Sequence, residues 1–311
     1  MRIFTTQDTL FIRGTWRAAS TGVSGGIRPV TTLLNHTVSP DFSSSPERVI
    51  TQVAARKGFD PAKTFGLLSA VPMKFLCIVQ VETITACIIA GINKDTDGDG
   101  TITIIICAAV PLSDAALLDA IITVSDAKAC VMRKNSYESC KTRNDAVIIA
   151  SEITTGNSFQ TCTQSVTPVR ILLDTAVSFG VNEALNRYNS QVPVTSPAYF
   201  IHSSIGGGHW FEWKKGSCPY YPCHFQGQRC DYCYCPLYPC ADETLGDWVM
   251  NISGKARVWS CARCILNHQP VVTDHLKKYP ESSIIELKHL ISLHGLPFRQ
   301  EKPDPPTIEV E

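Results

Sequence analysis

The sequence predicts a layered α/β or α+β domain of sheet and helices, followed by a small cysteine-rich zinc-binding domain. In the first 190 residues, apolar runs of strand length, rich in Ile, Val and Thr, are interspersed with helix-length segments. These runs lie within residues 74–83, 86–92, 101–110 and 145–151. Eight of the 14 cysteines then crowd between Cys218 and Cys264. This uneven distribution favours metal binding over disulfides.

Two segments of the first domain carry helix signals. Residues 111–131 contain the start signal Ser113-Asp114, followed by Ala and Leu at three- and four-residue spacing. Residues 169–188 are expected to form a second helix that closes the domain. Strands mixed with helices in this way indicate a layered domain rather than an all-β one.

Composition sets the expected boundaries. We expect a first domain over residues 1–190 and a linker rich in Pro, Ser and Gly over residues 191–207. The cysteine-rich domain, with one or two short helices at its C-terminal end, is expected over residues 208–296. The charged, Pro-rich residues 297–311 are expected to be disordered.

The charge balance argues against nucleic-acid binding, because Lys and Arg number 28 and so do Asp and Glu. The most apolar run, residues 75–92, has the length of a membrane span but contains Gln80 and Glu82. Two buried strands explain it better. The N-terminus shows no export-signal pattern. We therefore expect a cytoplasmic protein with no nucleic-acid or membrane partner, and the sequence leaves its oligomeric state open.

The cysteine cluster has the spacing of a metal-binding module. Two CxxC pairs, Cys230/Cys233 and Cys261/Cys264, each present two thiolates to one ion, and tetrahedral zinc takes four ligands. An iron–sulfur cluster and a disulfide framework are the alternatives, and the spacing does not reveal the pairing. The candidate ligands for two structural zinc ions are Cys218, Cys223, His224, Cys230, Cys233, Cys235, Cys240, Cys261, Cys264 and His268.

This segment resembles a known cysteine-rich small domain of the zinc-ribbon type. The resemblance covers residues 206–280 and rests on CPYYPCH, CDYCYCPLY and CARC with NH after it. It implies a module that occurs in prokaryotes, attached or adjacent to cobalamin-related enzymes. A protein partner that binds through this module is one expectation.

In the first domain, Gly25-Gly26 after Ser24 and the pair Asn35-His36 are candidates for chemistry. Glycine lets backbone amides approach a ligand, and Asn and His are suited to oxyanion stabilisation and proton transfer. The alternatives are an ordinary turn at the glycines and a hydrogen-bonded histidine without a catalytic role.

Residues 93–103 copy the first half of a calcium loop, with Asp95, Asp97 and Asp99. The position where calcium loops carry Glu is Ile106, which lies in an apolar run. We therefore expect a tight polar turn between two strands.

A third group of candidates is Asp126, Lys128, Thr142 and Asp145. Carboxylates and a lysine ahead of a buried strand can line an active site, and a solvated loop is the alternative.

Together these segments resemble the adenosylcobinamide amidohydrolase family of cobalamin salvage, over most of residues 10–188. The resemblance rests on SGGI, LLNHTV, GLLSA, the run from Gly100 to Ala129, and DTAVSFGVNEAL. It implies hydrolysis of adenosylcobinamide to adenosylcobyric acid and 1-amino-2-propanol. The corrinoid is then the substrate and not a cofactor.

The sequence departs from the family pattern at three places. Thr103 stands at the third position of a usual TINI, and Ser125-Asp126-Ala127-Lys128 replaces TEAK. The TGT-x-TD loop keeps only Thr142 and Asp145. A catalytically inactive corrinoid-binding or sensing protein is therefore one rival, and an adaptor that works through the zinc module is another.

If the activity is retained, we expect water or a hydroxyl group to attack the amide carbonyl. Asn35 and the amides of Gly25 and Gly26 would hold the oxyanion, and His36 would move protons. Asp126, Lys128 and Asp145 would position the substrate or act as acid or base. The expected substrate-binding residues are Ser24, Gly25, Gly26, Thr101, Thr103 and Thr142.

Overall fold

The computed structural model describes residues 1–92, 100–135, 137, 145–153, 168–203, 208–213, 222–232, 235, 237, 240–250, 257–279 and 281–300. The chain divides into two compact units, Met1–Lys214 and Lys215–Glu311. The expected calcium-like turn, together with Thr142, Cys218 and Cys233, lies outside the described residues. Strands β6 and β7 on either side of that turn are antiparallel, with Ile92 opposite Gly100.

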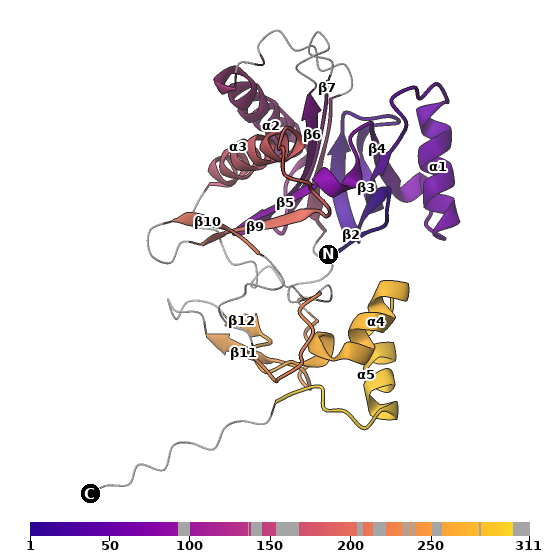
Figure 1. Cartoon of the computed structure of the whole chain (residues 1–311), viewed down its shortest axis with the longest axis vertical. Helices are drawn as coiled ribbons and strands as arrows, with labels where there is room; N and C mark the ends of the chain where they lie inside the picture. The colour runs from indigo at the N-terminus through magenta and orange to yellow at the C-terminus, as the bar shows by residue number, and fades with distance from the viewer. Residues whose placement is uncertain are drawn as a thin grey trace, which may run out of the picture. The chain divides into compact units, whose positions relative to one another are not determined.

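The first unit is built on one ten-stranded mixed sheet (Figure 1). Its order is β10-β9-β5-β6-β7-β8-β2-β3-β4, and β1 pairs with β2 beside this path. The strands are β1 (Arg2–Thr5), β2 (Thr9–Ser20), β3 (Gly26–Thr37), β4 (Thr64–Ser69), β5 (Cys77–Val81), β6 (Ile84–Ile92), β7 (Gly100–Ala108), β8 (Ala146–Glu152), β9 (Ala198–Ser203) and β10 (His209–Glu212). The four apolar runs of the sequence supply β5, β6, β7 and β8.

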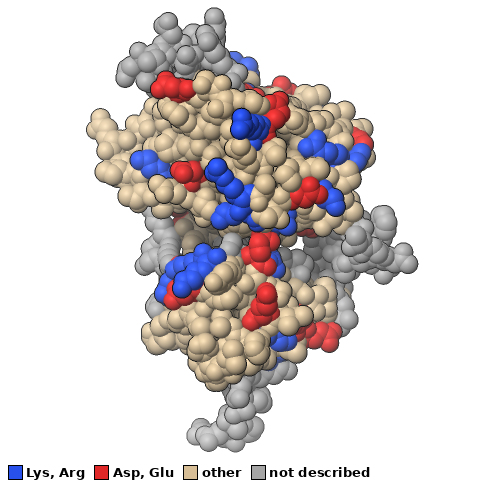
Figure 2. Space-filling model, turned by 90° about the vertical axis from the view of Figure 1, so that its right-hand side faces the viewer, with Lys and Arg blue, Asp and Glu red and all other residues tan. Residues whose placement is uncertain are grey.

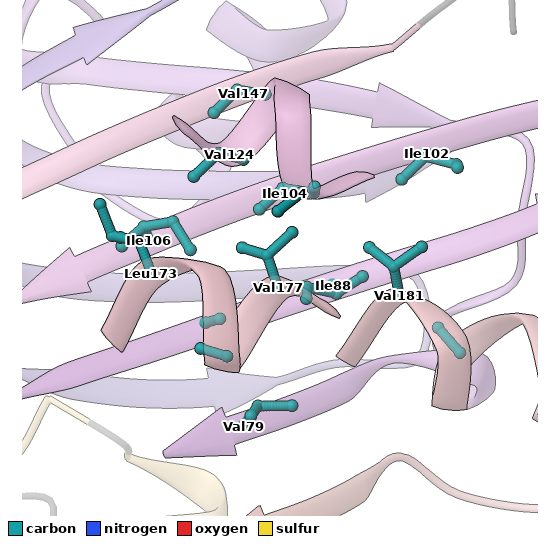
Figure 3. Packing of buried hydrophobic residues seen from close by; sticks show 14 of the residues in the cluster. Val79, Ile88, Ile102, Ile104, Ile106, Val124, Val147, Leu173, Val177 and Val181 are labelled. Atoms are coloured by element: carbon teal, nitrogen blue, oxygen red, sulfur yellow. The ribbon is translucent and has the colours of Figure 1, made fainter. Parts of the chain in front are cut away.

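Helices α2 (Asp114–Lys134) and α3 (Val169–Tyr188) cover one face of the strands β5 to β8 (Figure 1). The Ser113 side chain accepts the N–H of Ala116 and caps α2, as the Ser-Asp start predicts. Residues of alternating position on β7 face these helices, and Ile104 packs with Val124 and Val177 in this core (Figure 3).

The opposite face of β7 is also buried, which explains its uninterrupted apolar run. Ile105 and Cys107 pack there against Leu33 of β3 and Leu67 of β4 in a second core. The sheet therefore curls, so that strands far apart in its order face each other. Helix α1 (Pro46–Arg56) covers the outer side of β3 and β4, where Ile50 belongs to a small third core.

The end of the first unit differs from the expected linker. Residues 191–207 include β9, which pairs in parallel with β5, and β10 pairs with β9. The two prolines of this segment, Pro193 and Pro197, both precede β9. A six-residue strand in which Tyr199, Phe200 and Ile201 follow one another completes the sheet.

The second unit holds a two-stranded sheet, β11 (Asp247–Met250) with β12 (Arg257–Ser260), and the helices α4 (Pro270–Lys278) and α5 (Ile284–Leu293). Ser283 and Glu286 form a capping box at the start of α5. The core of the second unit joins Leu245, Leu266, Val272, Leu276, Leu287 and Ile291. Short 3-10 turns lie at Leu266–His268 in this unit, and at Pro61–Lys63 and Met73–Phe75 in the first unit.

The first residues of the expected disordered tail are ordered. The N–H of Ile265 donates to the carbonyl of Phe298 at 3.0 Å, and the N–H of Gln300 donates to that of Arg263 at 2.8 Å. Phe298 also packs on the core of the second unit. The segment thus returns along the CxxC turn, a pairing that its Pro-rich composition conceals.

Two surface observations bear on the class of protein. Acidic and basic side chains are interspersed on the face shown in Figure 2. Within the described part of the chain, none of the helices combines the length and apolar character required to span a membrane.

Candidate active site

An ion pair between Lys128 and Asp145 joins helix α2 to the edge of the sheet where β7 and β8 begin. Lys128 Nζ contacts Asp145 Oδ2, and only 19% and 15% of the two side chains are exposed. The second carboxylate oxygen, Oδ1, accepts the N–H of Ile102 at 2.9 Å. The structure thus brings together two of the predicted catalytic residues, and low exposure strengthens the attraction between their charges.

A second polar pair is buried on the opposite face of β7. Asn35 Nδ2 donates to Thr103 Oγ1 at 2.6 Å, and both side chains are buried. Asn35 Oδ1 is also buried, and it has no hydrogen-bond partner among the described residues. Such an unpaired acceptor costs about 1–3 kcal/mol. Thr101, two residues before Thr103, points to the same face. Asn35, Thr101 and Thr103 therefore form a small polar group within an otherwise apolar core.

The Gly25-Gly26 segment is a tight turn beside the start of β8. The N–H of Gly25 donates to the carbonyl of Gly22 at 3.1 Å, so this amide is used within the turn. A Cβ at Gly25 would lie 2.2 Å from the carbonyl oxygen of Ser20. The close approach of the Ser20 backbone explains why a glycine stands at position 25. This favours the interpretation of the segment as an ordinary turn over that of an oxyanion site. Thr21 anchors the turn, because its N–H donates to the carbonyl of Val147 at 3.0 Å.

His36 lies apart from Asn35 although the two are adjacent in sequence. Successive side chains of a strand point to opposite faces, so His36 shares the side of β3 that Leu34 buries against α1. Its Nδ1 lies 2.7 Å from Thr9 Oγ1. Burial lowers the pKa of His36, while Asp8 acts in the opposite direction. The structure therefore places His36 on the other side of β3 from Asn35, with which it was expected to act on the substrate amide.

Two further predicted residues lie on the surface. Asp126 is exposed on α2. It lies two residues before Lys128, and residues two apart in a helix point to different sides, so Asp126 does not share the side on which Lys128 pairs with Asp145. Ser24 is exposed in the glycine turn, where its φ is 52°.

The second unit contains a cavity of about 110 Å³ surrounded by potential metal ligands. Burial raises the pKa of the Cys235 thiol to about 12 and that of Cys264 to about 11, and the neighbouring thiols add to both shifts. A nearby cation is what would stabilise the thiolate forms. The cavity is lined by Cys235, Cys240, Cys261 and Cys264, together with His224 and His268.

The donor set fits zinc, although its members are not drawn together around one point. In the described residues, no three His, Cys, Asp or Glu side chains converge as a ready-made ion site. The Cys261–Cys264 turn is nevertheless formed, with the N–H of Cys264 donating to the carbonyl of Cys261 at 2.9 Å. Thiolate sulfur and imidazole nitrogen are the usual zinc ligands.

Comparison with known proteins identifies the first unit. The family model of adenosylcobinamide amidohydrolase matches residues 2–193. The chain belongs to the adenosylcobinamide amidohydrolase family. An adenosylcobinamide amidohydrolase of Methanosarcina mazei is 37% identical over 150 residues, which cover 47% of this chain and 74% of that protein.

The chain is also similar to a second domain family and to two further proteins. The model of a cysteine-rich small domain matches residues 209–290. An uncharacterised protein of Methanocaldococcus jannaschii is 49% identical over 85 residues, or 26% of this chain and 71% of that protein. A probable cobalt-factor III C(17)-methyltransferase of Methanothermobacter thermautotrophicus is 43% identical over 63 residues, or 20% of this chain and 17% of that protein.

These matches confirm the family resemblance, the α/β domain followed by a cysteine-rich domain, and the class of hydrolase that acts on an amide bond. The residues of this chain that perform the chemistry remain a prediction. Sequence reasoning also missed Gln228, which donates to two cysteine sulfurs. A single Gln between cysteines carries no recognisable signal, and only the fold reveals its contacts.

Proposed function

We propose that the first unit hydrolyses the amide that joins 1-amino-2-propanol to adenosylcobinamide, in corrinoid salvage. The products are adenosylcobyric acid and 1-amino-2-propanol. The observation that carries this proposal is the family match over residues 2–193, which spans the sheet up to the start of β9. The Lys128–Asp145 pair, which joins α2 to the sheet within that span, supports it further.

The site that we propose lies at the starts of β7 and β8. Water attacks the amide carbonyl, and negative charge develops on its oxygen. A nearby ammonium group such as Lys128 is suited to stabilise this charge in a low-dielectric setting. Asp145 fixes the position of Lys128 through Oδ2 and that of β7 through the Ile102 N–H. Its role in this proposal is to position Lys128.

Asn35 has a different part in the proposal from the one predicted. Its Nδ2 is engaged with Thr103, and its Oδ1 is the unpaired group. An acceptor of this kind is suited to hold a water molecule rather than an oxyanion. Asn35 and Thr103 are buried on the face of β7 opposite Lys128, so they lie away from the amide that Lys128 would polarise. Thr101 and Thr103 would complete this buried polar group.

Release of 1-amino-2-propanol tests the proposal. The purified full-length chain is incubated with adenosylcobinamide, and the amine is measured over time against a chain-free control. Enzymatic release supports the amidohydrolase. Tight corrinoid binding without release would overturn the proposal. It would favour the sensing protein, the alternative that the altered TGT-x-TD loop supports.

For the second unit, we propose structural zinc binding. The thiol and imidazole groups around one cavity support it, and a unit with so small a core gains much of its stability from metal ligation. The unit could also bind a protein partner. We further propose a cytoplasmic location, where thiols are kept reduced.

A further inference from the structure

A cavity of about 380 Å³ lies in the first unit, between the end of α3 and the segment that follows this helix. Residues 190–197 form much of its wall, and Glu183 and Arg187 of α3 and Glu212 of β10 complete it. The volume is within the range of small-molecule sites. None of the residues assigned above to the amidohydrolase reaction lines this cavity.

The wall segment is tied down at its far end. Arg187 Nη2 donates to the carbonyl of Ser196 at 2.6 Å, which connects the segment back to α3. The N–H of Ala198 donates to the carbonyl of Leu76 at 2.9 Å, where β9 begins. These bonds shape part of the expected linker into one wall of a pocket that is formed before any ligand binds.

The charges around the cavity favour a cation. The carboxylates of Glu183 and Glu212 line it together with one guanidinium, Arg187, so the side chains carry a net negative charge. Arg187 Nη1 lies 3.9 Å from Glu212 Oε1 and Nη2 is bonded to the wall segment, so this cation is part of the wall. The C-terminal end of α3 adds negative partial charge, because the helix dipole has its negative end there.

The backbone of the wall segment is short of N–H groups that an anion would need. Pro193 and Pro197 have no N–H. The N–H of Val192 is used within the segment, where it donates to Ser190 Oγ at 3.0 Å. The two carboxylates and the hydroxyl group of Thr195 accept hydrogen bonds. A ligand that donates several hydrogen bonds therefore suits this wall better than an anion does.

The ligand that fits these features is an organic cation rather than a metal ion. The part of the chain that the structure describes brings no three His, Cys, Asp or Glu side chains together as a metal site. A protonated primary amine donates three hydrogen bonds from one cationic group. A hydroxyl group on the same molecule would find polar partners in Asn186 and Thr195, which also line the cavity.

We propose that this pocket binds a small primary amine that also carries a hydroxyl group, which is the class of amino alcohols. The carboxylates of Glu183 and Glu212 bind its ammonium group, and Asn186 and Thr195 bind its hydroxyl group. This site is additional to the proposed hydrolysis and does not depend on it. The amine 1-amino-2-propanol belongs to this class and is a suitable probe.

Titration of the isotope-labelled, full-length chain with 1-amino-2-propanol at neutral pH tests the proposal, with amide chemical shifts as the readout. The amine is protonated at this pH, as the lysine side chain is. We expect binding in the millimolar range, because a small ligand makes few contacts, and the largest shifts in residues 190–197. The uncharged analogue 1,2-propanediol carries a hydroxyl group in place of the ammonium group. It should bind at least about 5-fold more weakly.

Substitution of the two carboxylates locates the ammonium group. The double variant Glu183→Gln with Glu212→Gln should weaken binding of the amine at least about 5-fold. Asp174→Asn removes an exposed carboxylate elsewhere on α3 and should leave the affinity unchanged. The double variant should also release amine from adenosylcobinamide at the wild-type rate, since neither carboxylate belongs to the Lys128–Asp145 site.

Three results would overturn the proposal. They are the absence of shifts in residues 190–197, equal binding of 1,2-propanediol and of the amine to the wild-type chain, and unchanged affinity in the double variant. The comparison of the two ligands needs no substitution, so it holds even if the double variant fails to fold. A wild-type chain that binds the amine in this pocket but releases none from adenosylcobinamide would overturn the proposed hydrolysis alone.

Discussion

Asn35 of β3 donates a hydrogen bond to Thr103 of β7, although β8 and β2 separate these strands in the order of the sheet. The bond crosses the inner core of the curled sheet, and it leaves Asn35 Oδ1 buried without a partner among the described residues. The unpaired oxygen lowers the stability of the fold, because its lost hydration is not compensated by a hydrogen bond. Polar groups kept at such a cost are typical of functional sites.

The Asn35–Thr103 pair should show a strong coupling in stability. Thr103→Val removes the acceptor and leaves both ends of the Asn35 amide unpaired, so we expect a loss of about 1–3 kcal/mol. The double variant Asn35→Leu with Thr103→Val replaces both polar partners and should regain most of this loss. Urea unfolding of the single and double variants measures the coupling. Additive losses would show that the bond contributes little.

The Lys128–Asp145 pair should be needed for turnover. Lys128→Met removes the ammonium group and leaves the carboxylate largely buried without its charge partner. We expect amine release to fall at least about 100-fold. Arg17, which pairs with Asp114 at 2.6 Å on the surface of the same unit, provides the control. Arg17→Met should keep the rate, and an equal fall in both variants would point to general destabilisation.

His36 separates the predictions of sequence and structure. The sequence predicts a proton carrier, so His36→Ala would lower turnover at least about 100-fold. The structure places this side chain on the α1 side of β3, away from Asn35. We therefore expect His36→Ala to keep most of the activity, whereas Asp145→Ala loses it. Rates of amine release decide between the two predictions. An equal fall in the His36→Ala and Asp145→Ala variants would show that His36 takes part in the reaction.

The same histidine should affect the pH dependence of stability. Burial lowers the pKa of His36 in the folded chain below the ordinary value of 6.5. The unfolded chain therefore binds the proton more readily, and stability falls as the pH drops below about 6.5. His36→Gln should flatten this part of the curve. Urea unfolding from neutral to mildly acidic pH measures the slope, and an unchanged slope would contradict the effect.

Gly180 should resist substitution. A Cβ at this position of α3 would lie 2.5 Å from Ile88 Cδ1 and 2.9 Å from Val79 Cγ2. Although alanine favours a helix more than glycine does, we expect Gly180→Ala to destabilise the fold by about 1–3 kcal/mol. Thermal unfolding measures this. Ser178→Ala, at a partly exposed position of α3, is the control and should cause little change.

Most helices and strands of the first unit's core could be predicted from local sequence patterns. The runs rich in Ile and Val became β5 to β8, and Ser113 caps α2 as its position before an amphipathic segment indicates. The curl of the sheet was not predictable in this way. It depends on contacts between β3, β4 and β7 that lie far apart in sequence, and such contacts leave no periodic signal.

The candidate site was predicted only in part for the same reason. Lys128 and Asp145 were chosen by residue type, and the fold brings them together. Asn35 and His36 were chosen as a pair because they are adjacent in sequence. In a strand, adjacency places two side chains on opposite faces, so recognising β3 as a strand would have separated them.

The pairing of β9 with β5 has a practical consequence for dividing this chain. The family match ends at residue 193, five residues before β9 begins at Ala198. A fragment cut there would lose β9 and β10, and β5 would become an outer strand with unsatisfied N–H and C=O groups. Open edges of this kind recruit strands from other molecules. A fragment that extends through Trp213 would keep β5 paired with β9 and should stay dispersed at concentrations where the shorter one aggregates.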